Sequence, residues 1–231
     1  MIMRKSNRSA SSTLQVFASG KTTVKRYVVF LDIMGFKERV ARFDHKDILS
    51  DLQQLSNFIS ENIKREEGFL FTMFSDSIII MSSDRKYTTF VKLVKLTNTI
   101  LERSISLNLP IKGAIAFGEC TVMSGDKALY FGQPIIDAYI LEESAELYNV
   151  VLHHTVEENA IRLSDTKEVF DCQVKLKGGV SNHYVLAWFA KSIDKNINNL
   201  VAIRKSVSDF PRRYIDNTLR CISEYKNAIQ S

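Results

Sequence analysis

The residues best suited to chemistry are two aspartates that interrupt strongly apolar runs. Asp32 follows the β-rich run Tyr27–Leu31, and Asp76 lies in the turn between the apolar runs Phe69–Phe74 and Ser77–Met81, a pattern typical of a tight antiparallel hairpin. If the hairpin packs beside the first strand, both carboxylates project from one edge of the sheet. Converging carboxylates without a cationic partner repel each other unless a divalent cation lies between them, and Mg²⁺ or Mn²⁺ commonly binds through one or two carboxylates plus phosphate oxygens. The pair therefore predicts a two-ion site for in-line phosphoryl transfer.

The segment after the first aspartate supports this interpretation. It connects a strand to the start of a helix and consists of Ile33, Met34, Gly35 and Phe36. Glycine lets the backbone approach a ligand closely, and the N–H groups at a helix N-terminus can cradle a triphosphate. The alternative is that Asp32 caps a helix and Asp76 merely fills a turn. The occurrence of both acids after four or more apolar residues favours the functional interpretation.

The surrounding pattern predicts one α+β domain with appended ends. Amphipathic helices are expected over 46–65 and 86–108, and a further helix over 132–148. Strands are expected over 111–117, 150–156 and 184–189, with a short strand ending near 130 and a helical linker between the last two. The order resembles a ferredoxin-like core with a central antiparallel sheet flanked by helices. We expect a flexible basic arm over 1–25, the main domain over 26–190 and a C-terminal helical extension over 191–231, broken in two at Pro211.

Composition narrows the functional classes. The chain has 231 residues, 45% of them apolar and 25% charged, and a formal net charge of +5, as expected of a soluble globular protein. The six basic residues of 1–26 stand without an acid, and 200–231 has six basic residues against three acids, so 27–199 carries −4. That acidic body, which has no basic-aromatic stripe, argues against nucleic-acid binding.

The chain shows no sign of a membrane or secretory segment. The longest apolar runs fall far short of the ~20 residues that a spanning helix requires, and the first 20 residues have no apolar centre, so we expect a cytoplasmic protein. The cysteines Cys120, Cys172 and Cys221 are widely spaced and odd in number, which predicts free thiols in a reducing compartment. The adjacent His153 and His154 would point to opposite faces of a strand and make a poor shared metal site.

Four segments, taken together, resemble class III nucleotidyl cyclase catalytic domains. The segment Phe30–Phe36 is similar to their first metal motif, and Phe74–Ser77 is similar to the second. Lys112–Gly118 looks like the strand that follows, and Gly132–Glu142 resembles the helix that begins Gly-x-x-Val-Asn in adenylate and guanylate cyclases. The match runs in order from about Tyr27 to Ala145, roughly half of the chain.

The resemblance implies a site and an assembly. It places the metal-binding aspartates at Asp32 and Asp76, with the carbonyl of Ile33 as an extra ligand for two Mn²⁺ or Mg²⁺ ions. It also implies attack of the ribose 3′ oxygen on the α-phosphorus of a nucleoside triphosphate, which yields a 3′,5′-cyclic nucleotide and pyrophosphate. The active sites of this family lie at a head-to-tail homodimer interface.

Four residues differ from those of the purine cyclases and indicate a particular subgroup of the family. Thr72 and Leu129 stand at the two base-reading positions, and Ile136 and Ile140 align with the transition-state Asn and Arg. The chain is most similar to the compact pyrimidine cyclases of bacterial antiphage Pycsar systems. That likeness implies synthesis of cyclic UMP, with cyclic CMP second, and a separate effector protein that responds to the messenger.

Helper residues can be suggested from their positions. Lys112 precedes Gly113 on its strand and is expected to neutralise phosphate charge as a catalytic residue. Lys37 and Arg39 follow the phosphate-cradling turn and are further candidates. The alternative for each of the three is that it is only a solvated surface cation. Three aromatic residues are candidates for stacking on a base at the dimer interface, namely Tyr130, Phe131 and Tyr139. Two other functions stay open, a purine cyclase with an unusual pocket and a non-catalytic cyclase-like module that binds nucleotide and transmits a signal.

Overall fold

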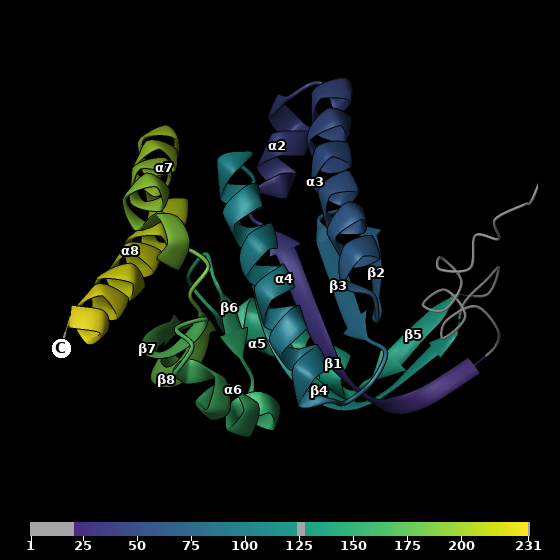
Figure 1. Cartoon of the computed structure of the whole chain (residues 1–231). Coiled ribbons are helices and arrows are strands. Elements are labelled where there is room, and N and C mark those ends of the chain that lie inside the picture. Colours follow the sequence, from purple (N-terminus) through teal and green to yellow (C-terminus); the bar gives the residue numbers. More distant parts are fainter. Residues whose placement is uncertain (1–20, 124–127, 231) are drawn as a thin grey trace, which may run out of the picture.

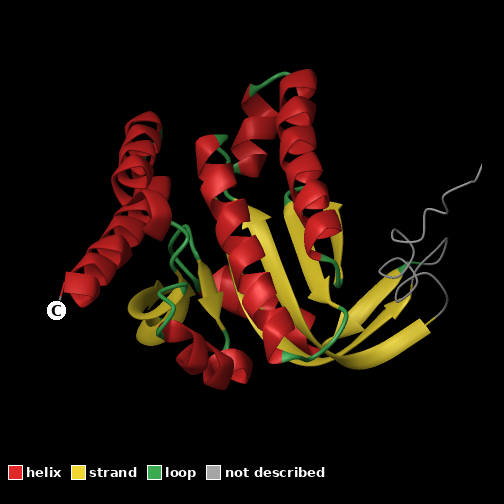
Figure 2. Ribbon diagram, viewed as in Figure 1, coloured by secondary structure: helices red, strands yellow, loops and turns green. Residues whose placement is uncertain are grey.

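The computed structural model describes residues 21–123 and 128–230, which form one twisted sheet with helices on both faces (Figures 1 and 2). The strand order is β2-β3-β1-β4-β6-β8-β7, and β5 pairs with β4 off this path. All pairs are antiparallel except β4 with β6. The strands are β1 Lys21–Ile33, β2 Phe69–Phe74, β3 Ser77–Ser82, β4 Ile111–Met123, β5 Leu129–Gly132, β6 Val150–Leu152, β7 Val169–Leu176 and β8 Gly179–Leu186.

Helices cover both faces of this sheet. Those longer than one turn are α2 Phe36–Arg42, α3 His45–Glu66, α4 Tyr87–Ser106, α5 Gln133–Ser144, α6 Glu157–Ser164, α7 Ile193–Ser206 and α8 Asp209–Gln230, and two 3₁₀ turns are η1 His154–Val156 and η2 Ala190–Ser192. In Figure 1, α3 and α4 lie in front of the sheet and α5 lies behind it. Within the described ranges, no helix is both long and apolar enough to cross a bilayer.

The second half of β1 is at the centre of the core, because the side chains of Tyr27–Leu31 are buried on both faces. Val29 and Leu31 belong to the large apolar cluster that includes residues of α3 and α4, whereas Phe30 belongs to a second cluster with Ala138 and Leu141 of α5. Successive residues of a strand point to opposite faces, so Asp32 lies on the same face as Phe30. The alternation therefore directs the carboxylate of Asp32 toward α5.

The central strands approach closely at Gly113 of β4. A Cβ added there would lie 2.5 Å from both Leu31 Cδ2 and the Phe30 carbonyl oxygen. Because the Phe30 oxygen belongs to the paired backbone, the clash has no cheap relief. We expect Gly113→Ala to lower the free energy of unfolding by roughly 2–3 kcal/mol, measured by urea denaturation. In Gly178→Ala, the matched control, the added Cβ meets nothing within 4 Å, and the change should stay within about 0.5 kcal/mol. Equal stability of the two variants would contradict this account of the strand packing.

Several boundaries differ from those expected of the sequence. Strand β1 begins at Lys21, inside the segment expected to be a flexible arm, because Lys21–Lys25 pair with Glu119–Met123 of β4. Residues 1–20 of that arm lie outside the described ranges. The helix that begins after Gly132 ends at Ser144 rather than near 148, and the strand at Val150 ends at Leu152, where a 3₁₀ turn follows.

Strand β7 replaces part of the expected helical linker. It is an edge strand in which Phe170, Cys172, Val174 and Leu176 face one apolar cluster and alternate with polar residues, the pattern of a half-buried strand. Helix α8 packs on β7, and α7 packs on α4. The two C-terminal helices separate at 207–208, and Pro211 falls in the first turn of α8, where proline is tolerated.

Candidate active site

The end of β1 and the β2–β3 turn bring the two aspartates to one edge of the sheet. Asp32 pairs with Ser77 in the β1–β3 register, and the backbone N–H of Ile33 donates to the carbonyl of Asp76 at 3.0 Å. Ser75 turns the chain with a left-handed φ of 57°. The expected convergence of residues 32 and 76 is therefore present, and both side chains are half-buried.

The surroundings of Asp32 disfavour its charged form. Burial raises the pKa of Asp32 to about 7, with the negative charges of Glu142 and then Asp76 adding to the rise and Lys112 opposing it. No ion pair among the described residues involves Asp32 or Asp76. The site thus gathers carboxyl groups in a partly desolvated place, and a bound cation would favour the charged form of Asp32.

The donor set fits a hard divalent cation that keeps other ligands. In the described part of the chain, no group of three or more His, Cys, Asp or Glu side chains is arranged to hold a metal. The ligands that the sequence led us to expect here are the carboxylates of Asp32 and Asp76 and the carbonyl of Ile33. Mg²⁺ is commonly held in this way, by one or two carboxylates with waters and substrate phosphates completing its shell.

The raised pKa of Asp32 predicts a pH dependence of stability. A carboxyl group with a native pKa near 7 and an unfolded value near 3.8 favours the folded state when protonated, so its contribution falls as pH rises from about 4 through 7. We expect the stability of the metal-free protein relative to Asp32→Asn to decrease between pH 5 and 8 in urea unfolding. Because the variant retains Glu142, the difference isolates Asp32. A difference that does not change with pH would contradict the assigned environment.

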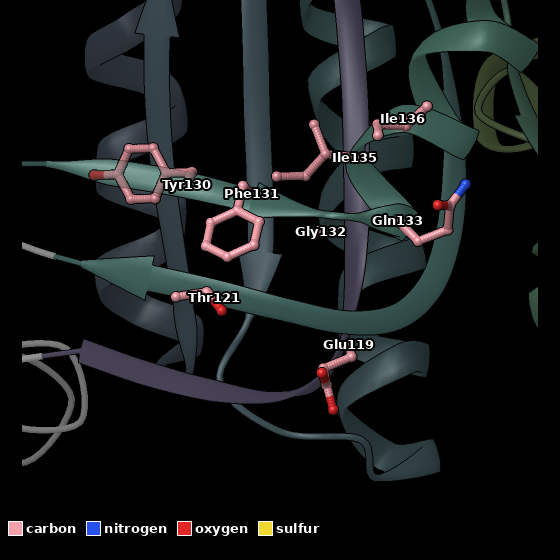
Figure 3. A pocket seen from close by; sticks show the side chains of 8 residues that line it. All are labelled: Glu119, Thr121, Tyr130, Phe131, Gly132, Gln133, Ile135 and Ile136. Carbon is pink, nitrogen blue, oxygen red and sulfur yellow. The ribbon is translucent and has the colours of Figure 1, made fainter.

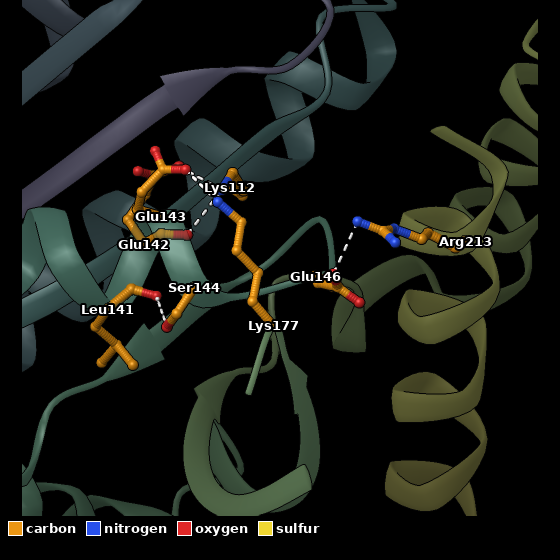
Figure 4. Close-up of polar contacts among 8 residues, drawn as sticks. All are labelled: Lys112, Leu141, Glu142, Glu143, Ser144, Glu146, Lys177 and Arg213. Carbon is orange, nitrogen blue, oxygen red and sulfur yellow. Dashed lines mark hydrogen bonds and ion pairs between the residues drawn. The ribbon is translucent and has the colours of Figure 1, made fainter. Parts of the chain in front are cut away.

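Lys112 lies beside Asp32 in the β1–β4 register but faces the interior (Figure 4). Its side chain is 6% exposed, and Nζ lies 2.8 Å from Glu142 Oε1 and 2.7 Å from the Glu142 carbonyl oxygen. It also lies 6.0 Å from the centre of the Tyr214 ring of α8. In this arrangement Lys112 is directed to Glu142 and not, as the sequence suggested, outward to a phosphate. Its geometry is that of a residue that positions and balances the acids.

The sequence did not indicate two further carboxylates at this edge. Glu142 and Glu143 end α5 on the Asp32 side of the sheet, and both raise the pKa of Asp32. Glu143 pairs with Lys177 from the β7–β8 turn, as Figure 4 shows. The segment that resembles the cyclase helix ends at Glu142, and the resemblance gives that residue no role. Its role follows only from the packing of α5 across β1 and β4.

The segment after Asp32 borders the acids as expected. The N–H of Met34 donates to the Pro110 carbonyl at 2.9 Å, which fixes the start of the turn. Gly35 has a left-handed φ of 72°, and helix α2 begins at Phe36. Of the two cations that follow, Lys37 is exposed and Arg39 is held by Asp51 at 2.5 Å. Lys37 is therefore the better placed of these two to meet an incoming anion.

Within one chain, Tyr130 lies far from Asp32 and Asp76. It pairs with Val122, ten residues along β4 from Lys112, which is roughly 30 Å at strand spacing. With Phe131, Gln133 and Ile136 it lines a separate open hollow of about 470 Å³ between β5 and the start of α5, bounded below by Glu119 (Figure 3). A single chain therefore keeps this aromatic hollow apart from the two aspartates.

Apolar side chains lie exposed along the same region. Ile136 and Ile140, one turn apart on α5, are 51% and 59% exposed. Tyr139 between them is 47% exposed while its ring meets Phe30 edge-on at 5.5 Å. Leu129 of β5 is also exposed, whereas Thr72 of β2 is half-buried opposite Ile79.

Solved structures with the same fold are catalytic domains of adenylyl and guanylyl cyclases. The adenylyl cyclase CyaB from P. aeruginosa is 20% identical, with 72% of this chain and 95% of that one covered at a TM-score of 0.57. The guanylate cyclase domain of RhGC from Catenaria anguillulae, solved with GTP, is 15% identical over 73% and 98% at 0.56. The catalytic core of a rhodopsin-guanylyl cyclase with converted specificity, in complex with ATPαS, is 16% identical over 72% and 98% at 0.58.

No protein-family model and no curated protein matches the chain. The structural likeness confirms the predicted α+β cyclase-type fold.

Proposed function

We propose that the chain is a nucleotidyl cyclase that converts a pyrimidine ribonucleoside triphosphate, UTP in preference to CTP, into its 3′,5′-cyclic monophosphate and pyrophosphate. The observation that carries the proposal is the convergence of Asp32 and Asp76 at one sheet edge, within a fold whose solved examples include adenylyl and guanylyl cyclase domains. Neither acid forms an ion pair among the described residues, which leaves both carboxylates available to a metal ion.

Each residue of this edge would have its own role in the reaction. Asp32, Asp76 and the Ile33 carbonyl would hold Mn²⁺ or Mg²⁺, which supplies activation of the 3′ hydroxyl and charge stabilisation at the phosphates. Ile33, Met34, Gly35 and Phe36 form the turn on which the triphosphate would rest. The buried ion pair of Lys112 and Glu142 would set the charge around Asp32 from within the protein.

The proposed active form is a homodimer. Tyr130 lies roughly 30 Å from the acids along β4 of its own chain, so it could contact substrate only in the site of a second copy. The exposed Ile136, Tyr139 and Ile140 of α5 offer apolar surface for such an interface. In a head-to-tail arrangement, the aromatic hollow of one copy would face the aspartates of the other.

The preference for a pyrimidine rests on residue types. Thr72 and Leu129 stand where purine cyclases read the base, and isoleucines stand at the positions of their transition-state Asn and Arg. By the same resemblance, the product would act as a messenger in bacterial antiphage defence and would be read by a separate effector protein. A purine cyclase is the second candidate, favoured by the adenylyl and guanylyl cyclases among the structural neighbours.

The test is incubation of the purified protein with each of the four ribonucleoside triphosphates, with Mn²⁺ or Mg²⁺ and with EDTA, followed by chromatography of the products. We expect one cyclic pyrimidine nucleotide plus pyrophosphate, formed only with metal. A cyclic purine product would establish the second candidate instead. No turnover of any triphosphate by protein shown to be dimeric would refute cyclase activity and favour a non-catalytic nucleotide-binding module.

A further inference from the structure

Two of the three cysteines meet between the edge strand and the last helix. Cys172 of β7 and Cys221 of α8 are 49 residues apart in sequence, yet their Sγ atoms lie 2.8 Å apart. Both residues are almost fully buried, at 2% and 1% exposure. Non-bonded heavy atoms usually stay about 3.5 Å apart or more, and a disulfide bond is about 2.05 Å long. The fold thus holds the two sulfur atoms closer than ordinary contact and within a small shift of bonding distance.

Neighbouring contacts fix the helix against the strand at this point. Glu224 Oε2 accepts from the N–H of Gln173 at 3.2 Å, and Arg220 Nη2 donates to the carbonyl of Gln173 at 3.0 Å. One turn before Cys221, the Thr218 hydroxyl accepts from the N–H of Tyr148 at 2.8 Å. Helix α8 is therefore anchored on both sides of Cys221, and the closed arrangement of the two elements places the thiols together.

We propose that Cys172 and Cys221 are a modification site, a dithiol that a hydroperoxide converts into an intramolecular disulfide joining α8 to β7. One thiolate attacks the peroxide oxygen, breaks the O–O bond and becomes a sulfenic acid, with one water or alcohol released. The second thiol then attacks that sulfur, the S–S bond forms and a second water leaves. Two thiols lose two electrons and two protons, and the peroxide gains both. This inference is independent of the cyclase proposal.

The local chemistry sets how fast the reaction runs. The hydrogen bond to Cys221 and burial raise the pKa of Cys172 well above its usual range, so the Cys172 thiol stays protonated in the closed structure. Because a thiolate is the reactive form, oxidation has to begin when α8 transiently leaves β7, and the bond then captures the closed arrangement. We therefore expect slower oxidation than that of free glutathione.

A bond at this place closes a long loop. Constraining 49 residues of the unfolded chain raises the melting temperature of the oxidised protein, by roughly 5–10 °C for a domain of this size. Cys120 of β4 is the internal reference. Its buried Sγ lies 3.8 Å from Met81 Sδ of β3, and no second cysteine lies beside it in the described part of the chain.

The experiment treats reduced, full-length protein with hydrogen peroxide, counts thiols with a maleimide after denaturation, and maps the cross-link by mass spectrometry of unreduced peptides. We expect three thiols to fall to one, a Cys172–Cys221 cross-linked peptide, and a higher melting temperature that dithiothreitol reverses. Cys120→Ala should fall from two thiols to none, whereas Cys221→Ala should keep both of its thiols.

Two results would overturn the proposal. One is wild-type protein whose Cys172 and Cys221 remain reduced, or are oxidised singly, after prolonged treatment with hydrogen peroxide. The other is a cross-link between two chains instead of within one. Both readouts use the wild-type chain, so they remain decisive even where a cysteine variant fails to fold.

Discussion

Replacing Asp32 by asparagine is expected to lower the turnover of nucleoside triphosphate by about 1,000-fold or more. Asparagine keeps the shape of the side chain but removes the negative charge that would hold a divalent cation beside Asp76, and metal assistance is worth several kcal/mol to phosphoryl transfer. Asp76→Asn should have a similar effect. Initial rates with saturating Mn²⁺ measure both.

The same substitution separates function from stability. Asp32 is half-buried with a pKa of about 7, so its charged form destabilises the metal-free fold at pH 8. Asp32→Asn should therefore unfold at equal or higher urea concentration than the wild type while losing activity. Asp165→Asn, a change at an exposed position after α6, is the matched control and should keep full turnover. Retained activity in Asp32→Asn would remove this residue from the reaction.

The second large effect is expected from the buried pair of Lys112 and Glu142. Lys112→Met or Glu142→Leu alone leaves one charge unpaired in the interior, which costs about 3–5 kcal/mol of unfolding free energy. The double variant removes both charges and should recover most of that loss. Urea unfolding of the two single variants and the double variant measures the coupling.

An exposed ion pair provides the comparison. Lys177→Met disrupts the contact with Glu143 at the surface, and its cost should stay below about 1 kcal/mol. The result also decides what Lys112 does. Wild-type stability in Lys112→Met, combined with weaker triphosphate binding, would show that Lys112 leaves Glu142 and contacts phosphate, contrary to the structure.

The convergence of the aspartates could be predicted because its signals are local. The apolar run before Asp32, the two-residue turn at Asp76 and the helices that follow each leave a strong pattern, and one antiparallel pairing brings them together. The run Tyr27–Leu31 was expected to be buried on both faces, and it is. The hydrophobic pattern thus identified the central strands and the edge of the sheet where they end.

Contacts between distant segments could not be predicted in this way. Lys112 has the same sequence pattern as a solvated lysine, and only the packing of α5 supplies Glu142 from 30 residues away. Arg39 similarly finds Asp51 on the next helix. Strand β7 is different, because its period-2 alternation from Phe170 to Leu176 was present in the sequence and was missed within the expected helical linker.

Tyr214 connects the C-terminal helix α8 to the central strand β4 beside the two aspartates. Its ring lies beside the Lys112 ammonium group, while Thr218, one turn later, holds the segment that follows α5. A shortened gene product that stops before α8 would therefore lose part of the wall behind the two aspartates, although none of its deleted residues is a candidate ligand. An affinity tag joined after the exposed residues 227–230 would leave that wall intact. The last helix is best kept together with the sheet and the two aspartates when the chain is divided for expression.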